Sequence, residues 1–379
     1  MGIAEFKKDT VYRKLRNSII HGAYLHNHKF PRELDFSKEL GVGKVTLRTA
    51  LEKLEGEGLV ARLPSRGTYV TYKKGHGGES GCVLLLTDES GGMENPYLYI
   101  LPGLQERAAE ISRRTTTCPA RYLLSQSVPE LRGMVCSNDI AGAVILGANF
   151  NGSEPLIGAL KNMNIPVVIA HAVAGDREIT GFATVRSDFR ASWKTAIQHL
   201  AERGHEKVAT LILGRAGKNI RDYSEDEYLG LLSSFGMDAD RELILRADYD
   251  GKSVCREISA FFKKSGAKPT AILCYSDFMA IYLYETLKKM KIRVPQDIAV
   301  MGYCGYPGAA LMSPTLSTVD FQYARIGAAS LDLLAASDKW FGSDAVAAAP
   351  EIFIDHVLRE RESSSIRRIE KNFKNGRGI

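Results

Sequence analysis

Three side chains near residue 45 have the chemistry and the spacing to contact a nucleic acid. Lys44, Thr46 and Arg48 follow Gly43 in the stretch "GVGKVTLRTALEKLEGEGLV", residues 41–60. Arginine and lysine at the start of a helix can reach guanine O6 and N7, and a threonine hydroxyl can hold a phosphate. We predict that these residues contact DNA. The alternative, for each residue taken singly, is an ordinary solvated surface side chain.

The same stretch predicts the helix that must position those side chains. Leu47, Leu51 and Leu54 recur at helical spacing and would face a core, which leaves the basic and hydroxyl side chains outside. Gly41 ends the preceding segment and Gly58 ends the helix itself, because glycine tolerates the positive φ of a helix C-terminus.

Elements on either side of that helix complete a small DNA-binding fold. Apolar spacing before Gly22 predicts a first helix, and a short second helix is expected over 36–40. After the third helix, "LVARLPSRGTYVTY" predicts two short strands joined by a tip that carries Arg66 and Gly67. We therefore expect an α+β winged helix-turn-helix over residues 1–73, with the tip placed to enter the minor groove.

This head resembles the GntR family of transcriptional regulators over residues 10–72. The matching residues lie in the third helix and the wing: Val42, Thr46, Leu47, Arg48, Ala50, Leu51, Leu54, Glu57, Gly58, Leu59, Arg66, Gly67, Thr68 and Val70. The resemblance implies that Lys44, Thr46 and Arg48 belong to the recognition helix and that Arg66 and Gly67 belong to the DNA-contacting wing.

Two positions depart from the GntR pattern. The family usually carries Pro-Ser-Glu-Arg at the start of its second helix, with the arginine on DNA, whereas this chain has "PREL" over 31–34. Leu34 cannot donate a hydrogen bond, and Arg32 is the candidate to replace the missing contact from another angle. Gly43 replaces the usual serine before the basic residue. The operator sequence therefore cannot be borrowed from relatives.

The charge distribution agrees with DNA binding by the head alone. Residues 1–80 contain 15 Lys and Arg against 9 Asp and Glu, and residues 361–379 contain 6 against 2. Residues 81–360 contain 29 Lys and Arg against 33 Asp and Glu. A basic head on a mildly acidic body indicates that only the head meets a polyanion.

The body alternates apolar runs with amphipathic stretches after a glycine-rich linker at 74–80. The runs are CVLLL (82–86), AVILG (143–147), PVVIA (166–170), VATLIL (208–213), AILCY (271–275) and IAVMGY (298–303). This alternation predicts an α/β fold with a doubly wound parallel sheet. Because residues 81–360 are too many for one such sheet, we expect two lobes, followed by a frayed basic tail over 361–379.

Three stretches of the body resemble the LacI-type, periplasmic-binding-protein-like fold. The matching residues are Asp188, His199, Leu200, Gly204 and His205, then Ser276, Asp277, Ala280, Val294, Pro295, Asp297, Ile298, Gly302 and Tyr303, with an Asn-Pro-aromatic loop at 95–97. A GntR head on a LacI body is similar to regulators of the arabinose-repressor type. The resemblance implies a small-molecule effector, a sugar or sugar derivative, bound between two lobes at the carboxyl ends of strands.

That resemblance also implies a set of effector-binding positions. They are Tyr97, Asn149, His171, Arg221, Tyr249, Asp277 and Cys304. Pyranoses need aromatic faces and polar groups, which these side chains could supply. The alternatives are a plain surface position for Tyr97, Arg221 and Tyr249, and an N-cap of the following helix for Asp277.

Cys304 and Phe189 depart from the LacI pattern. Relatives carry an aspartate that grips the ligand where this chain has Cys304, and an asparagine where it has Phe189. A thiol is a poor hydrogen-bond acceptor. We therefore expect an effector that is less hydroxylated, or held by other residues, or absent.

Motif content argues against a metal site, a cofactor or a catalytic centre. The cysteines show no CxxC and no zinc spacing, which is typical of reduced cytosolic thiols: Cys82, Cys118, Cys136, Cys255, Cys274 and Cys304. GxGxxG, P-loop, GxSxG and HExxH motifs are absent from the sequence. The enzyme alternative would make Cys304 a nucleophile, yet no activating base can be assigned to it.

These observations together predict a sequence-specific DNA-binding transcriptional regulator, expected to be a repressor and a homodimer, that binds a double-stranded operator and a carbohydrate effector. No apolar run approaches a membrane span and no secretory signal is evident, so we expect a cytoplasmic protein. An exported binding protein is a weaker alternative, since the basic head and the missing signal oppose it. The main alternative is a regulator with a decayed pocket, controlled by a protein partner or a non-sugar ligand.

Overall fold

A computed structural model of the chain describes residues 2–20, 23–24, 28–63, 66–72, 81–87, 92–214, 219–220, 222–264, 268–341 and 349–364. Packing divides the chain into two units. Unit 1 consists of Met1–Gly91, Ile100–Val185 and Ile326–Ile352, and unit 2 consists of Gly92–Tyr99, Arg186–Arg325 and Phe353–Ile379. The predicted linker, 74–80, lies outside the described residues.

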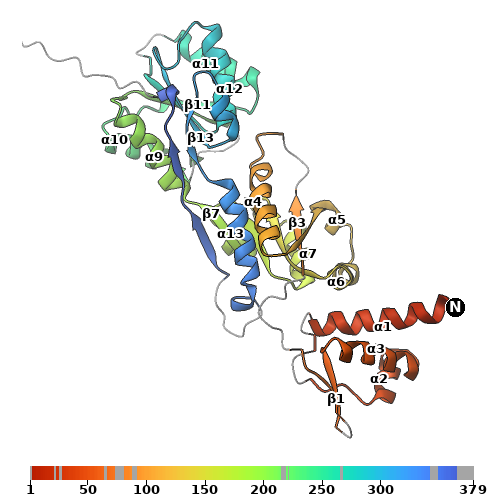
Figure 1. Cartoon of the computed structure of the whole chain (residues 1–379). Helices are drawn as coiled ribbons and strands as arrows, with labels where there is room; N and C mark the ends of the chain where they lie inside the picture. The colour runs from red at the N-terminus through yellow and green to blue at the C-terminus, as the bar shows by residue number, and fades with distance from the viewer. Residues whose placement is uncertain are drawn as a thin grey trace, which may run out of the picture. The chain divides into compact units, whose positions relative to one another are not determined.

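The first residues of unit 1 form the expected winged helix-turn-helix (Figure 1). Its elements are α1 (Gly2–Ile20), α2 (Glu33–Glu39), α3 (Lys44–Gly56), β1 (Val60–Leu63) and β2 (Gly67–Val70). β1 and β2 pair antiparallel, from Val60 opposite Val70 to Leu63 opposite Gly67. This head has a hydrophobic core of its own, built from all three helices and both strands between Val11 and Val70.

The helix boundaries in the head follow the glycines and the charged first turns. Gly41 and Gly58 adopt positive φ, 64° and 72°, as expected at helix ends. The second helix begins earlier than predicted, at Glu33. Its first turn carries Glu33 and Asp35, and negative charge there stabilises the N-terminal end of the helix dipole.

The remainder of unit 1 is an α/β layer structure around a six-stranded sheet, in the order β15-β7-β6-β5-β3-β4. The strands are β3 (Cys82–Thr87), β4 (Arg114–Pro119), β5 (Ile140–Leu146), β6 (Val167–Ala170), β7 (Ala183–Ser187) and β15 (Glu351–Ile354). The helices are α5 (Ala120–Leu124), α6 (Val128–Ser137), α7 (Pro155–Met163) and α8 (Asp176–Thr180), with a 3₁₀ turn at Ser337–Lys339. Unit 1 also holds α4 (Tyr97–Glu110) from Ile100 onward and α13 (Tyr323–Ala335) from Ile326 onward. The strands from β4 to β7 pair in parallel.

Both faces of this sheet are covered, which explains the continuous apolar runs. Five of the six residues of β3 are buried, so its side chains are covered on either face. Alternate residues such as Leu84 and Ile145 pack against α5, α6 and α7. On α13, a Cβ at Gly327 would lie 2.3 Å from the Ile100 carbonyl oxygen. Only glycine permits that close contact with α4.

Unit 2 contains a second six-stranded sheet, in the order β11-β8-β12-β13-β14-β16. Its strands are β8 (Val208–Leu213), β11 (Ile244–Ala247), β12 (Ala271–Cys274), β13 (Ala299–Cys304), β14 (Ser317–Asp320) and β16 (Val357–Arg359), beside a hairpin of β9 (Asn219–Ile220) and β10 (Tyr223–Ser224). Its helices are α9 (Phe189–Ala201), α10 (Glu225–Ser234), α11 (Gly251–Lys263) and α12 (Asp277–Lys289), with 3₁₀ turns at Arg241–Leu243, Pro307–Leu311 and Glu362–Ser364. Within the described part of this six-stranded sheet, β16 alone pairs antiparallel, with β14, and the small hairpin of β9 and β10 is antiparallel too.

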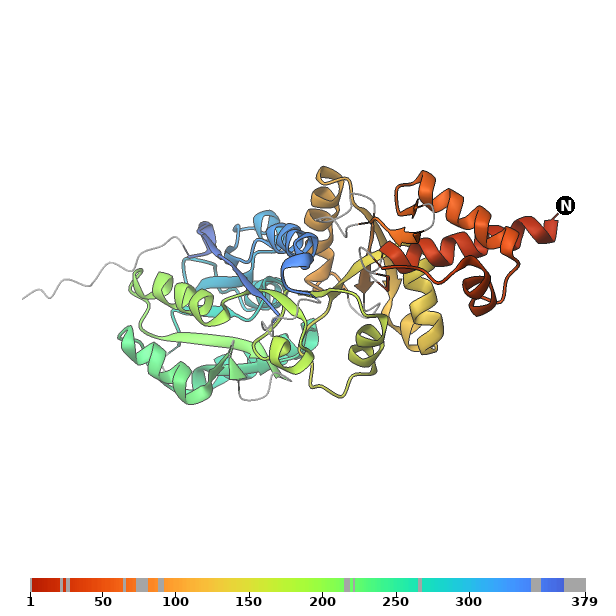
Figure 2. The ribbon, with the colours of Figure 1, turned by 90° about the horizontal axis from the view of Figure 1, so that it is seen from below.

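Helices also flank the strands of unit 2, as Figures 1 and 2 show. Residues of β8, β12 and β13 share a buried cluster with α11 and α12. On α9, Trp193 packs edge-on against Tyr303 at a ring-centroid distance of 4.7 Å. The expected doubly wound parallel sheet is thereby confirmed, as one sheet in each unit.

All six strands predicted from apolar runs are present, but several others were missed. The missed strands include β4, whose sequence RTTTCP is polar because it forms a sheet edge. The tail is also better ordered at its start than expected. The Ser363 hydroxyl donates to the Val300 carbonyl at 2.6 Å, and the Arg361 guanidinium donates to the Leu316 carbonyl at 2.7 Å. Fraying therefore does not begin at residue 361.

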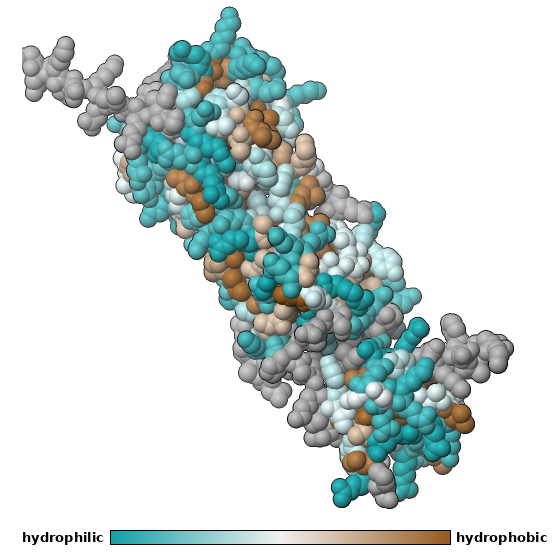
Figure 3. Space-filling model, viewed as in Figure 1, coloured by the Kyte–Doolittle hydropathy of each residue, from teal (hydrophilic) through white to brown (hydrophobic). Residues whose placement is uncertain are grey.

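The surface seen in Figure 3 is mainly hydrophilic, with hydrophobic side chains in scattered patches. In the part of the chain that the structure describes, no helix is long and apolar enough to cross a membrane. Within the same residues, no group of three or more His, Cys, Asp or Glu side chains is arranged to hold a metal ion.

Candidate nucleic-acid interface and effector site

The third helix presents its basic residues to solvent, as a DNA-reading helix must. Leu47, Ala50, Leu51 and Leu54 are buried in the core of the head. Lys44 and Arg48 are exposed, and Thr46 is half-buried. Because the helix begins at Lys44, all three predicted contact residues lie in its first two turns. Backbone N–H groups of the first turn also favour phosphate.

Arg48 lies close to an acidic residue of α2. Its guanidinium is 3.5 Å from the Glu33 carboxylate, and 64% of the side chain is exposed. Arg62 from β1 holds the same carboxylate more closely, at 2.6 Å. The long contact to Glu33 is weak in water, so it leaves Arg48 able to reorient toward a phosphate or a base.

The residues at the first departure from the GntR pattern, at the start of α2, are also on the surface. Arg32 is exposed and is the N-cap residue of α2. Leu34, in the position of the family arginine, is 47% exposed. Arg32 thus lies where it could contact a phosphate near α2, whereas the apolar side chain of Leu34 cannot donate a hydrogen bond to one.

A basic residue that the sequence did not single out, Lys29, lies beside the wing and its predicted residue Arg66. Arg66 is exposed beside Gly67, whose φ is 104°. The Lys29 ammonium lies 5.5 Å from the centre of the Tyr69 ring, and the Lys29 side chain comes close to Gly67. Lys29 is far from the wing in sequence, and only its bridge pairing with Tyr69 brings it there.

In unit 1, two predicted effector residues follow neighbouring strands. Asn149 comes after β5 with φ 68°, and His171 comes after β6 with φ 59°. Buried Asp176 ties their loops together, since its carboxylate accepts hydrogen bonds from the N–H groups of Asn149 (3.1 Å), Phe150 (2.8 Å) and Val173 (2.8 Å). Left-handed backbone in non-glycine residues is uncommon and is often associated with functional loops.

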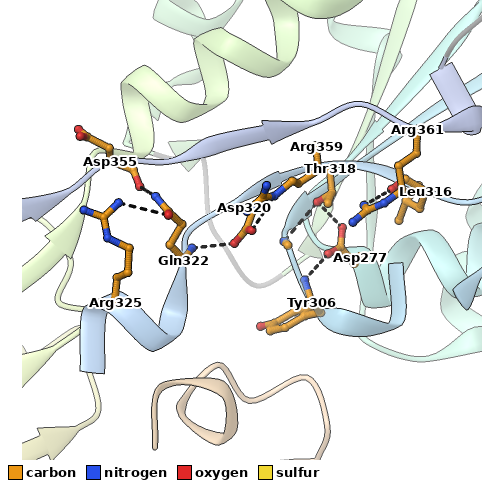
Figure 4. Close-up of polar contacts among 11 residues, drawn as sticks. Asp277, Tyr306, Leu316, Thr318, Asp320, Gln322, Arg325, Asp355, Arg359 and Arg361 are labelled. Atoms are coloured by element: carbon orange, nitrogen blue, oxygen red, sulfur yellow. Dashed lines mark hydrogen bonds and ion pairs between the residues drawn. The ribbon is translucent and has the colours of Figure 1, made fainter. Parts of the chain in front are cut away.

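In unit 2, Asp277 is the centre of a buried polar cluster (Figure 4). It is 2% exposed. Its carboxylate accepts hydrogen bonds from the Tyr306 N–H and from the Thr318 hydroxyl, each at 2.7 Å. The alternative for Asp277, an N-cap of α12, was wrong, because the side chain of Ser276 caps this helix by accepting from the Met279 N–H.

The environment of Asp277 also changes its acidity. Burial raises the pKa of Asp277 to about 7, although the hydroxyl of Thr318 and nearby backbone N–H groups lower it. A carboxyl group so enclosed holds the loop after β13 in place. Its predicted contact with an effector stays a prediction.

Cys304 is the last residue of β13 and is buried. Its φ is 107°, and its thiol lies 4.0 Å from the Tyr275 carbonyl oxygen. The N–H of the next residue, Gly305, donates to the Thr318 hydroxyl at 3.2 Å. The backbone at the departure from the LacI pattern is thus held by the same cluster as Asp277. Phe189 is buried as well, and packs edge-on against Phe321.

An aromatic group beside this cluster was missed from the sequence. The Tyr306 ring lies 4.7 Å from Tyr99, 5.1 Å from Phe278 and 5.5 Å from Tyr323, and it stacks on the last of these. The Tyr306 hydroxyl donates to the Glu94 carbonyl at 2.9 Å. Aromatic residues two positions beyond Tyr97 and Cys304 were the available signal, but their proximity depends on the tertiary fold.

The other predicted effector residues of unit 2 have different surroundings. Tyr97 is half-buried at the start of α4, and its N–H donates to the Asn95 side chain at 3.1 Å. Tyr249 is half-buried and packs on the hydrophobic cluster of β8, β12, α11 and α12. Arg221 lies outside the described residues. Asp188, which matches the LacI pattern but is not among the predicted effector residues, caps α9 by accepting from the Ala191 N–H at 2.9 Å.

A chain of polar contacts follows β14 in Figure 4. The Asp320 carboxylate accepts from the Arg359 guanidinium at 3.0 Å and from the Gln322 N–H at 2.7 Å. The Gln322 amide in turn donates to the Asp355 carbonyl at 2.6 Å. These contacts tie the end of β14 to β16 and to the residues just before it.

Family comparisons agree with both parts of this description. Residues 7–70 match the model described as bacterial regulatory proteins of the gntR family, and residues 197–364 match a periplasmic binding protein-like domain. An arabinose metabolism transcriptional repressor from Halalkalibacterium halodurans is 24% identical over 313 residues, which cover 79% of this chain and 80% of that repressor.

Solved structures show the same fold. A transcriptional regulator, CelR, in complex with cellobiose has a TM-score of 0.58 at 18% identity, covering 88% of this chain and 100% of that chain. A LacI family transcriptional regulator from Enterococcus faecium with bound ribose has a TM-score of 0.55 at 16% identity, and the match covers 76% of this chain and 100% of that chain. The chain therefore joins a GntR-type winged-helix domain to a periplasmic-binding-protein-like domain, and it is a DNA-binding transcriptional regulator.

Proposed function

We propose that this regulator is a repressor whose affinity for a specific operator changes when a small molecule binds to its α/β domain. The observation that carries the proposal is a head with its own core and an outward-facing basic helix, joined to a domain of the LacI-like fold. The arabinose repressor and the structures with cellobiose and ribose support a sugar or a sugar derivative as the effector.

Within this proposal the head contacts DNA through two elements. Lys44, Thr46 and Arg48 contact the major groove or its phosphates from α3, and Arg66 with Gly67 contacts DNA from the wing. Arg32 adds a phosphate contact from the start of α2. Two heads in a homodimer would meet two half-sites of the operator.

The effector in this proposal binds at the carboxyl ends of the parallel strands. Asn149 and His171 in unit 1, and Tyr97, Tyr249 and Arg221, are the candidates to contact it. Asp277 and Cys304 would act mainly by holding the loop after β13, because both are buried. The protein would act in the cytoplasm, without catalysis, cofactor or metal.

Two measurements on the full chain test the proposal. A gel shift against DNA upstream of its own gene should show a specific complex that weakens with salt. A thermal-shift screen over mono- and disaccharides should show one sugar that raises the melting temperature by several degrees, because a ligand that binds only the folded state stabilises it. The same sugar should then change the affinity for DNA. The absence of any specific DNA complex, with or without sugars, would disprove the proposal.

A second candidate is a regulator controlled by a protein partner or a non-sugar ligand. Cys304 favours it, since a buried thiol replaces the ligand-gripping carboxylate and points to a carbonyl. Specific DNA binding without any sugar-induced thermal shift would support this candidate over the first. Rapid alkylation of Cys304 at neutral pH would instead reopen the enzyme alternative.

A further inference from the structure

Val45 is an aliphatic residue at the start of the recognition helix that the structure leaves 72% exposed. It is the second residue of α3, between Lys44 and Thr46. The buried residues of α3 define the side that faces the core. At about 100° per residue, Val45 lies roughly 170° from the centre of that side, so it is directed away from the core. Lys44, Thr46 and Arg48 lie farther from the middle of the outward face.

Exposed apolar residues in the described part of the head occur at three places that face DNA in a winged helix. Leu34 (47% exposed) is at the start of α2, Val45 is at the start of α3, and Leu63 (43% exposed) ends the first strand of the wing. A single exposed valine needs no explanation on an ordinary surface. On the helix that reads DNA, however, its chemistry limits which base edge it can meet.

We propose that Val45 packs against the C5-methyl group of thymine in the major groove and so selects an A·T pair in each operator half-site. This inference rests on the proposed function, in which α3 contacts DNA. The thymine methyl is the apolar group of the major-groove edge. Opposite guanine or cytosine, a valine would cover O6, N7 or N4 without offering a hydrogen bond, and that desolvation disfavours a G·C pair.

The neighbours of Val45 strengthen the assignment. The Thr49 hydroxyl, one turn later, donates to the Val45 carbonyl at 3.0 Å, so its proton already has an acceptor within the helix. Glu52, two turns later on the same side, is exposed, carries a negative charge and lies 3.5 Å from Arg62. A carboxylate on this side disfavours close approach of phosphates, so base contact is concentrated at the first turn, where Val45 lies. Lys44 and Arg48 flank it, and each can contact a phosphate or a base edge.

The experiment uses the full chain and an operator selected from a randomised duplex library. Each thymine of the selected site is replaced singly by deoxyuridine, which removes only the methyl group, and the dissociation constant is measured by fluorescence anisotropy. At one position in each half-site we expect a loss of about fourfold, the effect of one methyl-sized apolar contact. Val45→Ala removes the contact from both half-sites, so it should bind the thymine site about as weakly as the natural chain binds a duplex with deoxyuridine in both half-sites. The variant should show no further loss with deoxyuridine.

Two further variants serve as controls. Val45→Thr has nearly the same shape and keeps one methyl group, so it should retain part of the sensitivity. Leu63→Ala removes another exposed apolar side chain of the head, but the thymine methyl lies in the major groove and the wing is expected in the minor groove. This variant should keep the full sensitivity to deoxyuridine.

The outcomes separate this inference from the function on which it rests. If no sequence is selected, the proposed DNA-binding function fails. If a specific operator is selected but deoxyuridine has no effect, or if Val45→Ala remains as sensitive as the natural chain, the Val45 contact is wrong and DNA binding stands. Alanine favours helix and the site is exposed, so the variant should fold normally.

Discussion

The carboxylate of Asp277, the first residue of α12, accepts a hydrogen bond from the N–H of Tyr306 at 2.7 Å, which links the loop after β13 to that helix. Unit 1 has a counterpart in Asp176, whose carboxylate accepts three backbone N–H groups of the loops after β5 and β6. In each unit a buried carboxylate therefore shapes the strand ends. Such a residue can influence an effector site without touching the effector.

Replacing Asp277 by Asn should change how stability depends on pH. Burial raises the pKa of Asp277 to about 7, whereas an unfolded aspartate titrates near 4. Between these values the folded chain keeps a proton that the unfolded chain has released. The free energy of unfolding should therefore fall as pH rises from 4 to 7, by up to about 1.4 kcal/mol per pH unit. Urea unfolding at several pH values measures this. If the free energy of unfolding changed with pH in the same way for the natural chain and for Asp277→Asn, the prediction would be contradicted.

His199 should produce the opposite slope. Burial, and then the nearby Arg203, lower the pKa of His199 to about 4, and its ring contacts the Ser364 hydroxyl at 2.7 Å. Below pH 6.5 the unfolded histidine gains a proton that the folded one does not. The contribution of His199 to the free energy of unfolding is fully present above pH 6.5 and is lost as the pH falls toward 4. His199→Gln should remove that loss in the same urea titration. An unchanged acid slope in the variant would show that His199 is not buried as a neutral ring.

Gly305→Ala should destabilise unit 2 far more than Gly308→Ala. Gly305 has φ 74°, and a Cβ there would lie 2.4 Å from the Cα of Asp320. Gly308 has no atom within 4 Å of its added Cβ. We expect a loss of roughly 3 kcal/mol or more for the first variant and less than about 1 kcal/mol for the second. Calorimetric melting compares them. Equal melting temperatures would mean that the loop after β13 does not pack on β14 in this way.

Arg48→Ala should weaken operator binding without unfolding the head. Loss of a good base contact corresponds to roughly 10- to 100-fold in affinity, whereas loss of the exposed Glu33 contact affects stability little. Arg293→Ala is a matched control, because Arg293 is 71% exposed and is also paired with a carboxylate, but lies in unit 2. Anisotropy titrations at two salt concentrations, with circular dichroism, check both variants. Unchanged operator affinity for Arg48→Ala would remove its assigned role.

The sequence predicted the head well because its information is local. Helical spacing of Leu47, Leu51 and Leu54, with glycines at the helix ends, predicts α3 within a few residues. The apolar runs predict the central strands for the same reason, since a strand covered on both faces is continuously apolar. Edge strands such as β4 were not predicted, because an edge strand is partly exposed to solvent and its sequence is therefore not continuously apolar.

The roles of individual side chains depended on contacts between distant parts of the chain. Asp277 meets Thr318, Lys29 meets Tyr69, and the ring of Tyr99 meets that of Tyr306. None of these pairs follows from spacing along the chain, because strand register and helix docking decide which side chains meet. The burial of Cys304 and the 72% exposure of Val45 are likewise results of packing.

By itself, the sequence determined that this protein has a DNA-binding head and an α/β body, because periodicity, glycine positions and family motifs are properties of short segments. The tertiary structure alone decided which residues of those motifs remain available for contact. It placed the Asp277 carboxylate among backbone donors and left Val45 facing solvent. The physical reason is that hydrogen bonding and burial are set by neighbours in space, which the local pattern does not specify.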